Sequence, residues 1–100
     1  MTELRRYARA PFDCELVYRI TGDTQEHPGR ARDISLGGMF ITCEPPPFGS
    51  NVTVRFHIVG EKDPLELPAV VRWSGDGGMG VQFLSIGARE THHITNLTRP

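Results

Sequence analysis

The sequence predicts a small all-β domain, either an antiparallel barrel or a sandwich, on three observations. The chain has 100 residues, which is the size of one domain with a single modest core. Short segments alternate apolar and polar residues with a period of two, as strands with one buried face do. Glycine, proline and aspartate separate these segments. A barrel is favoured because its closure leaves no strand edge exposed.

Residues 1–12 are predicted to be a flexible arm, followed by the barrel domain of residues 13–100. The arm has few apolar side chains, so little offsets the entropy cost of ordering it. It carries Arg5, Arg6 and Arg9 against one acidic residue, although the formal net charge of the whole chain is -1. Any anion binding is therefore expected to be local to the arm.

Alternation predicts the strands one by one, and turn residues mark their ends. Residues 13–21 form the first predicted strand, and the polar residues 22–29 are expected to form a turn. Pro68 interrupts a later run and predicts a bulge or an edge there. Residues 75–78, rich in glycine, predict a tight hairpin. The remaining predicted strands are residues 39–43, 52–58, 65–73 and 79–83, with a strand end at 30–33.

The inward positions of these strands predict the core. Residues 87–97 are expected to form a short helix, whose apolar stripe consists only of Ile94 and Leu97. Such a helix is marginal alone and must dock on the barrel. The side chains predicted to be buried are Val54, Phe56, Val71, Trp73, Val81 and Phe83.

Other features of the sequence argue against several classes of function. The two cysteines, Cys14 and Cys43, are too few for a secreted disulfide scaffold and are expected to be unpaired. His92 and His93 would diverge on a helix and make a poor metal site. No apolar run approaches the ~20 residues of a membrane helix, and no signal peptide is visible, so we expect a cytoplasmic protein without membrane insertion. No catalytic set stands out, so no catalytic residue, metal or cofactor is predicted, and the chain is expected not to be an enzyme.

The arginines of the arm suit an anionic ligand. Arg5 and Arg9 are four residues apart, which keeps both side chains on roughly the same side of a strand or a helix. A guanidinium group is always charged, and it binds phosphate or the O6/N7 edge of guanine through paired donors. Taken alone, however, an arginine-rich terminus is most often a solvated tail.

The stretch from Asp33 to Gly38 supplies complementary acceptors. Ionised Asp33 only accepts hydrogen bonds, which suits the N–H groups on the Watson–Crick edge of guanine. Ser35 can bond a phosphate or a neighbouring main-chain group. Gly37 and Gly38 allow a positive φ and a close approach of the backbone to a ligand. Taken alone, this pattern is most often a turn whose side chains bond their own backbone.

The two motifs together resemble the signature pair of PilZ domains. Arg5-x-x-x-Arg9 matches the RxxxR motif, and Asp33-x-Ser35-x-x-Gly38 matches the (D/N)xSxxG motif, in the expected order and at a typical separation. The resemblance covers nearly the whole chain. It extends to the segments at residues 37–41, 70–73 and 80–83, which look like strands of that family.

The resemblance implies a six-stranded antiparallel β-barrel with a short C-terminal helix. It also implies binding of cyclic di-GMP, a bacterial second messenger. Arg5 and Arg9 would grip phosphates and guanine, Arg6 would be an extra contact, and the second motif would line the barrel beneath a guanine. The implied ligand-binding residues are Arg5, Arg6, Arg9, Asp33, Ser35, Gly37 and Gly38.

The expected function is that of a stand-alone cyclic di-GMP receptor in motility or biofilm regulation. The arm would fold over the ligand and change the surface shown to a downstream protein partner, with the receptor a monomer or weak dimer. One rival is a PilZ-type adaptor that binds no nucleotide, which the intact motifs argue against. Another is a small-barrel nucleic-acid-binding module, which the net charge of -1 and the few evident surface aromatics argue against.

Overall fold

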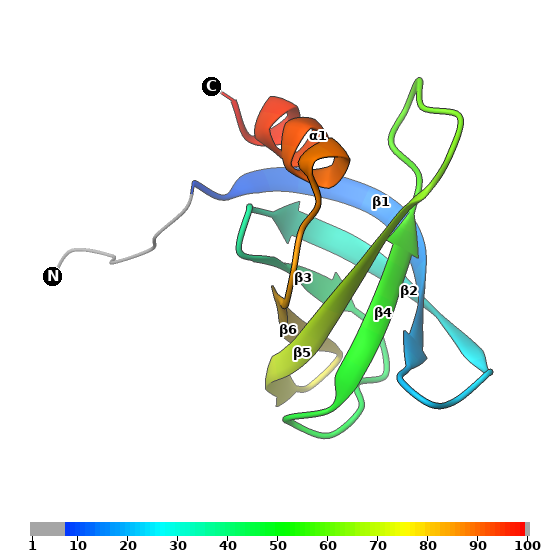
Figure 1. Ribbon diagram of the computed structural model, residues 1–100. Helices are drawn as coiled ribbons and strands as arrows, with labels where there is room; N and C mark the ends of the chain where they lie inside the picture. The colour runs from blue at the N-terminus through cyan, green and yellow to red at the C-terminus, as the bar shows by residue number, and fades with distance from the viewer. Residues whose placement is uncertain (1–7, 100) are drawn as a thin grey trace, which may run out of the picture.

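The computed structural model describes residues 8–99, and in it the six-stranded antiparallel β-barrel and the C-terminal helix are confirmed (Figure 1). The barrel closes in the order β1-β2-β3-β6-β5-β4, so β1 pairs with both β2 and β4. Each pairing is antiparallel. The elements are β1 (Ala10–Ile20), β2 (Glu26–Ile34), β3 (Gly38–Thr42), β4 (Asn51–Phe56), β5 (Leu65–Gly75), β6 (Gly78–Phe83) and α1 (Ala88–Thr98).

Two strands begin three or more residues earlier than the sequence predicts. Strand β1 starts at Ala10, and Pro11 already pairs with Asp33, so the first strand is not limited to residues 13–21. Strand β2 starts at Glu26, so the turn predicted for residues 22–29 ends before Glu26 and is shorter than predicted. The error has a simple cause: one face of these strands lies outside the barrel, where polar residues are compatible with strand structure.

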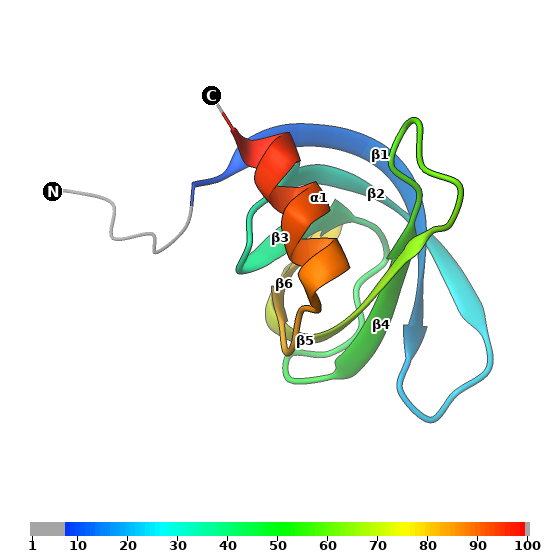
Figure 2. The ribbon, with the colours of Figure 1, turned by 45° about the horizontal axis from the view of Figure 1, so that its top comes forward.

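The interior of the barrel is filled by aliphatic and aromatic side chains, and helix α1 covers one end (Figure 2). Ile94 of α1 is completely buried in this core, and Leu97 packs partly against it. The helix therefore docks as its thin apolar stripe requires. Both cysteines are free, as expected.

Three β-bulges interrupt the regular pairing. They fall between Pro11 and Cys14 in β1, between Ala31 and Asp33 in β2, and between Val71 and Trp73 in β5. A bulge adds one residue to a strand and turns the following side chains to the opposite face. Of the bulge or edge expected at Pro68, the bulge lies a few residues later, since Pro68 pairs regularly with Thr53. Pro68 also lies just outside the residue pairs that join β5 to β6, which begin at Ala69.

The bulge in β5 explains an error in the predicted core. Alternation buries Leu67, Ala69 and Val71, and without an extra residue it would bury Trp73 as well. Instead Arg72 is the extra residue, and Trp73 lies on the outer surface with 50% of its area exposed. The predicted burial of Trp73 is therefore wrong. The other predicted core residues, Val54, Phe56, Val71, Val81 and Phe83, are buried.

Candidate functional site

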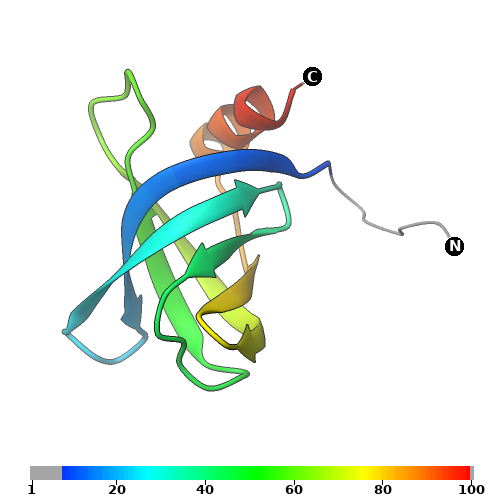
Figure 3. The same cartoon turned by 180° about the vertical axis from the view of Figure 1, so that it is seen from behind.

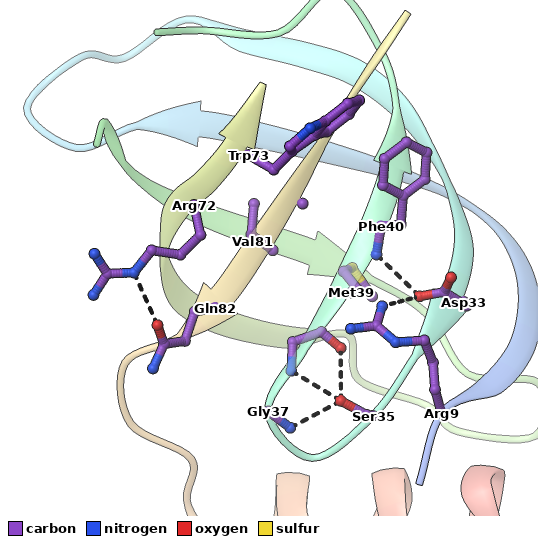
Figure 4. Close-up of a pocket in the computed structure, with 12 residues that line it drawn as sticks. Arg9, Asp33, Ser35, Gly37, Met39, Phe40, Arg72, Trp73, Val81 and Gln82 are labelled. Carbon is purple, nitrogen blue, oxygen red and sulfur yellow. Dashed lines mark hydrogen bonds and ion pairs between the residues drawn. The ribbon is translucent and has the colours of Figure 1, made fainter. Parts of the chain in front are cut away.

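A pocket of about 570 Å³ opens on the outer face of the barrel. Strands β3, β6 and β5 lie side by side there (Figure 3), and the turn between β2 and β3 closes one end. Arg9, which immediately precedes β1, lies at its border (Figure 4). A volume of this size suits a small organic ligand. The pocket is thus a candidate binding site on the surface of the barrel and not inside it.

Arg9 and Asp33 form an ion pair at one side of this pocket. Nη1 of Arg9 donates to Oδ1 of Asp33 at 2.5 Å, and 31% of each side chain remains exposed. The same Oδ1 accepts from the backbone N–H of Phe40 at 3.3 Å. Among the described residues Oδ2 of Asp33 has no hydrogen-bond donor (Figure 4). One carboxylate oxygen is therefore fixed by Arg9 and Phe40, and the other can accept a further hydrogen bond as far as residues 8–99 are concerned.

The bulge in β2 is what brings Asp33 to the surface. Ala31 and Ile34 are both completely buried although they are three positions apart, which regular alternation forbids. The extra residue between them is Arg32, and it leaves Asp33 on the outer face opposite Phe40. A polar side chain that alternation would bury is thus turned toward the pocket.

Ser35 organises the turn between β2 and β3. Its Oγ accepts hydrogen bonds from the N–H groups of Gly37 at 3.1 Å and Gly38 at 3.2 Å. Its own N–H donates to the carbonyl of Gly38 at 2.8 Å. Only 4% of Ser35 is exposed. Its hydroxyl therefore shapes the turn from within, which is the local role that such a pattern most often has.

The backbone conformation of Gly37 and Gly38 differs from one of the two uses that the sequence suggests. Neither Gly37 nor Gly38 has a positive φ, so the expected use of the left-handed region is wrong. Gly38 is required by close packing, because a Cβ there would lie 2.0 Å from the carbonyl oxygen of Val81. The missing side chain lets β6 approach β3 at the floor of the pocket.

An aromatic wall that the sequence did not reveal forms another side of the pocket. The rings of Phe40 and Trp73 lie 5.5 Å apart with their planes tilted by 45° (Figure 4). Glycines make room for them: a Cβ at Gly75 would lie 2.6 Å from the indole, and one at Gly78 would lie 2.8 Å from the Phe40 ring. The glycine-rich stretch at residues 75–80 was the available signal, and its role is to accommodate aromatic rings as well as to turn the chain.

Arg72 and Gln82 lie on the far side of the pocket from Arg9 (Figure 4). Nε of Arg72 donates to Oε1 of Gln82 at 2.9 Å, which links neighbouring strands β5 and β6. Neither residue was identified from the sequence. In the described part of the chain, Arg72 has no carboxylate partner, whereas Arg9, Arg30 and others form ion pairs.

The structure brings together five of the seven predicted site residues. Arg5 and Arg6 lie outside the described residues. The five residues that line the pocket are Arg9, Asp33, Ser35, Gly37 and Gly38.

Other titratable groups lie away from the pocket. His93 pairs with Glu61 at 3.2 Å, between α1 and the loop before β5. Burial raises the pKa of Cys14 and of Cys43, which makes both thiols poor nucleophiles. Within residues 8–99, no three His, Cys, Asp or Glu side chains gather closely enough to hold a metal ion. The same part of the chain contains no helix of sufficient length and apolarity to cross a bilayer.

These features define a small closed β-barrel with a charged and aromatic pocket on its outer face. The chain belongs to the PilZ domain family, whose model matches residues 3–99. No curated protein sequence matched the chain.

Solved structures with the same fold share few of its residues. The PilZ domain of CeSA from a cellulose-synthesizing bacterium is 20% identical, with a TM-score of 0.74 over 90% of this chain and 93% of that one. The PilZ domain of YcgR from Escherichia coli, solved with c-di-GMP, is 17% identical, with a TM-score of 0.72 over 97% and 93% of the two chains. PlzA of Borreliella burgdorferi, in complex with c-di-GMP, is 15% identical, with a TM-score of 0.73 over 95% of this chain and 41% of PlzA. These likenesses establish the common barrel.

Proposed function

We propose that this PilZ domain is a receptor for cyclic di-GMP and binds it in the pocket beside Arg9 and Asp33. The observation that carries the proposal is the convergence of an arginine, a carboxylate and an aromatic wall in one pocket of suitable volume. The c-di-GMP found with YcgR and with PlzA, which share the fold, gives further support.

The chemistry of the pocket suits a guanine nucleotide. Arg9 offers donors to a phosphate or to the O6/N7 edge of guanine. Oδ2 of Asp33 can accept from the ring and amino N–H groups of guanine. Adenine has no ring N–H at that edge, so the carboxylate favours guanine. In this proposal Arg9 and Asp33 read the base and the phosphate, while Ser35, Gly37 and Gly38 hold the turn beneath it.

The exposed aromatic rings add a surface for the bases. Flat bases stack on aromatic side chains, and each such contact contributes roughly 1–3 kcal/mol where it has been measured in nucleic-acid complexes. Trp73 is half exposed and borders the pocket together with Phe40. Stacking is tolerant of base identity, so these rings would contribute affinity while Asp33 contributes selectivity.

The signal would leave the domain through the N-terminal segment. Arg5 and Arg6 would complete the grip on the ligand, and the segment that carries them would become ordered around it. That change would alter the surface presented to a downstream protein partner in motility or biofilm regulation. The domain would act as a monomer or a weak dimer and would relay the signal without catalysing a reaction.

Calorimetric titration with cyclic di-GMP tests the proposal, because it measures both affinity and stoichiometry. Wild-type protein should bind saturably, and Arg9→Ala should bind more weakly. Arg55→Ala is a matched control, because Arg55 is also a partly exposed, ion-paired arginine but lies outside the pocket on β4. Absence of binding at high micromolar ligand would favour the adaptor that binds no nucleotide.

A further inference from the structure

We propose that Arg72, oriented by Gln82, is a second cationic contact for the half of the ligand that Arg9 and Asp33 do not reach. This inference rests on the proposed function and adds two residues from β5 and β6 that lie outside both sequence motifs. It assigns the far side of the pocket to the second phosphate or the second guanine of the dinucleotide.

The position of Arg72 supports this assignment. Arg9 and Arg72 border the same pocket from opposite sides, with Gly37 and Val81 between them (Figure 4). A cyclic dinucleotide carries one phosphate and one base in each half. Among the described lining residues Arg9 is at one side of the pocket, so a second cation across the pocket matches the repeated charge of the ligand.

The charge of Arg72 is available for a ligand. Its Nε bonds the neutral amide of Gln82, and no carboxylate of the described residues lies within ion-pair distance. Arg55, by contrast, lies between Glu26 and Glu66 and has its charge compensated within the protein. Within the described residues, the charge of Arg72 is therefore uncompensated where an anion is expected.

Gln82 fixes the direction of this charge. An exposed arginine loses rotamer freedom when it binds a ligand, and that loss weakens binding. The bond from Nε to Oε1 of Gln82 at 2.9 Å already restrains the side chain. Within residues 8–99 no hydrogen bond engages the two terminal nitrogens, so they can form the paired donor contact that guanidinium makes with phosphate or with the O6/N7 edge of guanine.

The backbone of β5 adds an independent argument. Arg72 is the extra residue of the bulge between Val71 and Trp73, and bulges are frequent next to functional sites, where they redirect side chains. Because of this bulge, the consecutive residues Arg72 and Trp73 both lie on the outer surface. A regular strand would have sent one of the two into the barrel.

Titration of cyclic di-GMP into matched variants tests the assignment. Arg72→Ala should weaken binding by about tenfold or more, the range of one hydrogen bond to a charged group. Arg55→Ala, which removes the same charge outside the pocket, should bind like the wild type. Gln82→Ala should weaken binding less than Arg72→Ala and should have no further effect once Arg72 is alanine, because Gln82 acts through Arg72. Melting temperatures of the ligand-free variants verify that each is folded.

A double variant tests whether the two arginines bind different halves. Contacts at separate sites act independently, so the losses of Arg9→Ala and Arg72→Ala should multiply. The inference is overturned if Arg72→Ala binds like Arg55→Ala, or if the double variant binds no more weakly than Arg9→Ala alone. Either result leaves the proposed function intact as long as the wild type binds. A wild type that does not bind removes the proposed function and this inference with it.

Discussion

Asp33 and Trp73 occupy equivalent positions, each directly after the extra residue of a β-bulge. The alternation that buries Ala31 and Val71 would otherwise place both side chains inside the barrel. Because of the two bulges, a carboxylate from β2 and an indole from β5 face the same pocket. The site therefore depends on two local departures from regular strand geometry, on either side of β3 and β6.

The stability of the ligand-free barrel should depend on its core side chains and hardly at all on the charged residues of the pocket. Phe56 is 2% exposed and packs edge-on against Phe12, so Phe56→Ala should lower the free energy of unfolding by about 3–5 kcal/mol. Arg9→Ala removes only a partly exposed ion pair, which contributes about 0–1 kcal/mol. Urea denaturation of the ligand-free proteins measures both changes. A loss for Arg9→Ala comparable to that for Phe56→Ala would show that the arginine is structural.

The strands and most of the core could be predicted from the sequence, because alternation and turn residues are visible within each short segment. Val54, Phe56, Val71, Val81 and Phe83 are all buried as predicted, and α1 begins within one residue of its predicted start. Bulges are not local signals, because they depend on how two strands pair. Trp73 was therefore placed on the wrong face.

The candidate site was predictable only in part, for the same reason. Asp33 and Arg9 were identified by the chemistry of their side chains and by their motifs, and the structure brings them together. Nothing in the sequence distinguishes Arg72 and Gln82 from other polar residues. Only the pairing of β5 with β6 shows that they lie beside a pocket. Ser35 and Gly38 line the same pocket, but their roles in the turn and in strand packing required the structure.

Trp73 provides an intrinsic probe of binding. It is the only tryptophan in the sequence, and it is half exposed at the pocket. Cyclic di-GMP should therefore change the intensity or the wavelength of its fluorescence, with a midpoint equal to that found by calorimetry. Adding the ligand to the Arg9→Ala variant should shift this midpoint to higher concentration. An unchanged spectrum at saturation would place the ligand away from the aromatic wall.

Tyr18 should make the stability of the barrel sensitive to alkaline pH. It is 3% exposed, its hydroxyl donates to the carbonyl of Glu44, and burial raises the pKa of Tyr18 to about 12. Unfolded tyrosine loses its proton at about pH 10, whereas the folded protein retains it until about pH 12. The stabilisation is therefore complete below about pH 10 and is lost as pH rises toward 12, by up to about 2–3 kcal/mol.

The Tyr18→Phe variant isolates this effect. It lacks the titrating hydroxyl, so its stability should fall less than that of the wild type between about pH 10 and 12. It should also be less stable near neutral pH by about 1 kcal/mol, because the hydrogen bond to Glu44 is lost. Urea denaturation at a series of pH values gives the difference between the two proteins. A difference that stays constant across this range would contradict the assignment to Tyr18.

Hydrogen exchange tests the proposed response of the N-terminal segment. If Arg5 and Arg6 bind the ligand, amide exchange at residues 3–10 should slow when cyclic di-GMP is added. Helix α1 and strand β4, none of whose residues lines the pocket, serve as internal references. Equal exchange of the segment with and without saturating ligand would exclude the relay by ordering while leaving ligand binding itself in place.

Arg9 and Asp33 should affect binding in different ways although they touch each other. Hydrogen bonds to charged groups contribute roughly 1.5–3 kcal/mol, so Arg9→Ala and Asp33→Ala should each weaken cyclic di-GMP binding by about tenfold or more. Loss of Arg9 should reduce the dependence of affinity on salt concentration, because a phosphate-neutralising charge is gone. Loss of Asp33 should instead reduce the preference for cyclic di-GMP over cyclic di-AMP, because the acceptor for the guanine N–H groups is gone.

Calorimetry at two salt concentrations, with both dinucleotides, separates these effects. Asp33→Asn is a matched control, because its amide oxygen can still accept from the backbone N–H of Phe40 while one ligand acceptor is lost. Its preference for guanine should be lower than that of the wild type, because the nitrogen in place of Oδ2 donates and cannot accept from the guanine N–H groups. The losses of Arg9 and Asp33 should not multiply, since each change alone also breaks the ion pair between them. If Asp33→Ala binds cyclic di-GMP with full guanine preference, Asp33 does not read the base, and the assignment of the second motif to guanine recognition is wrong.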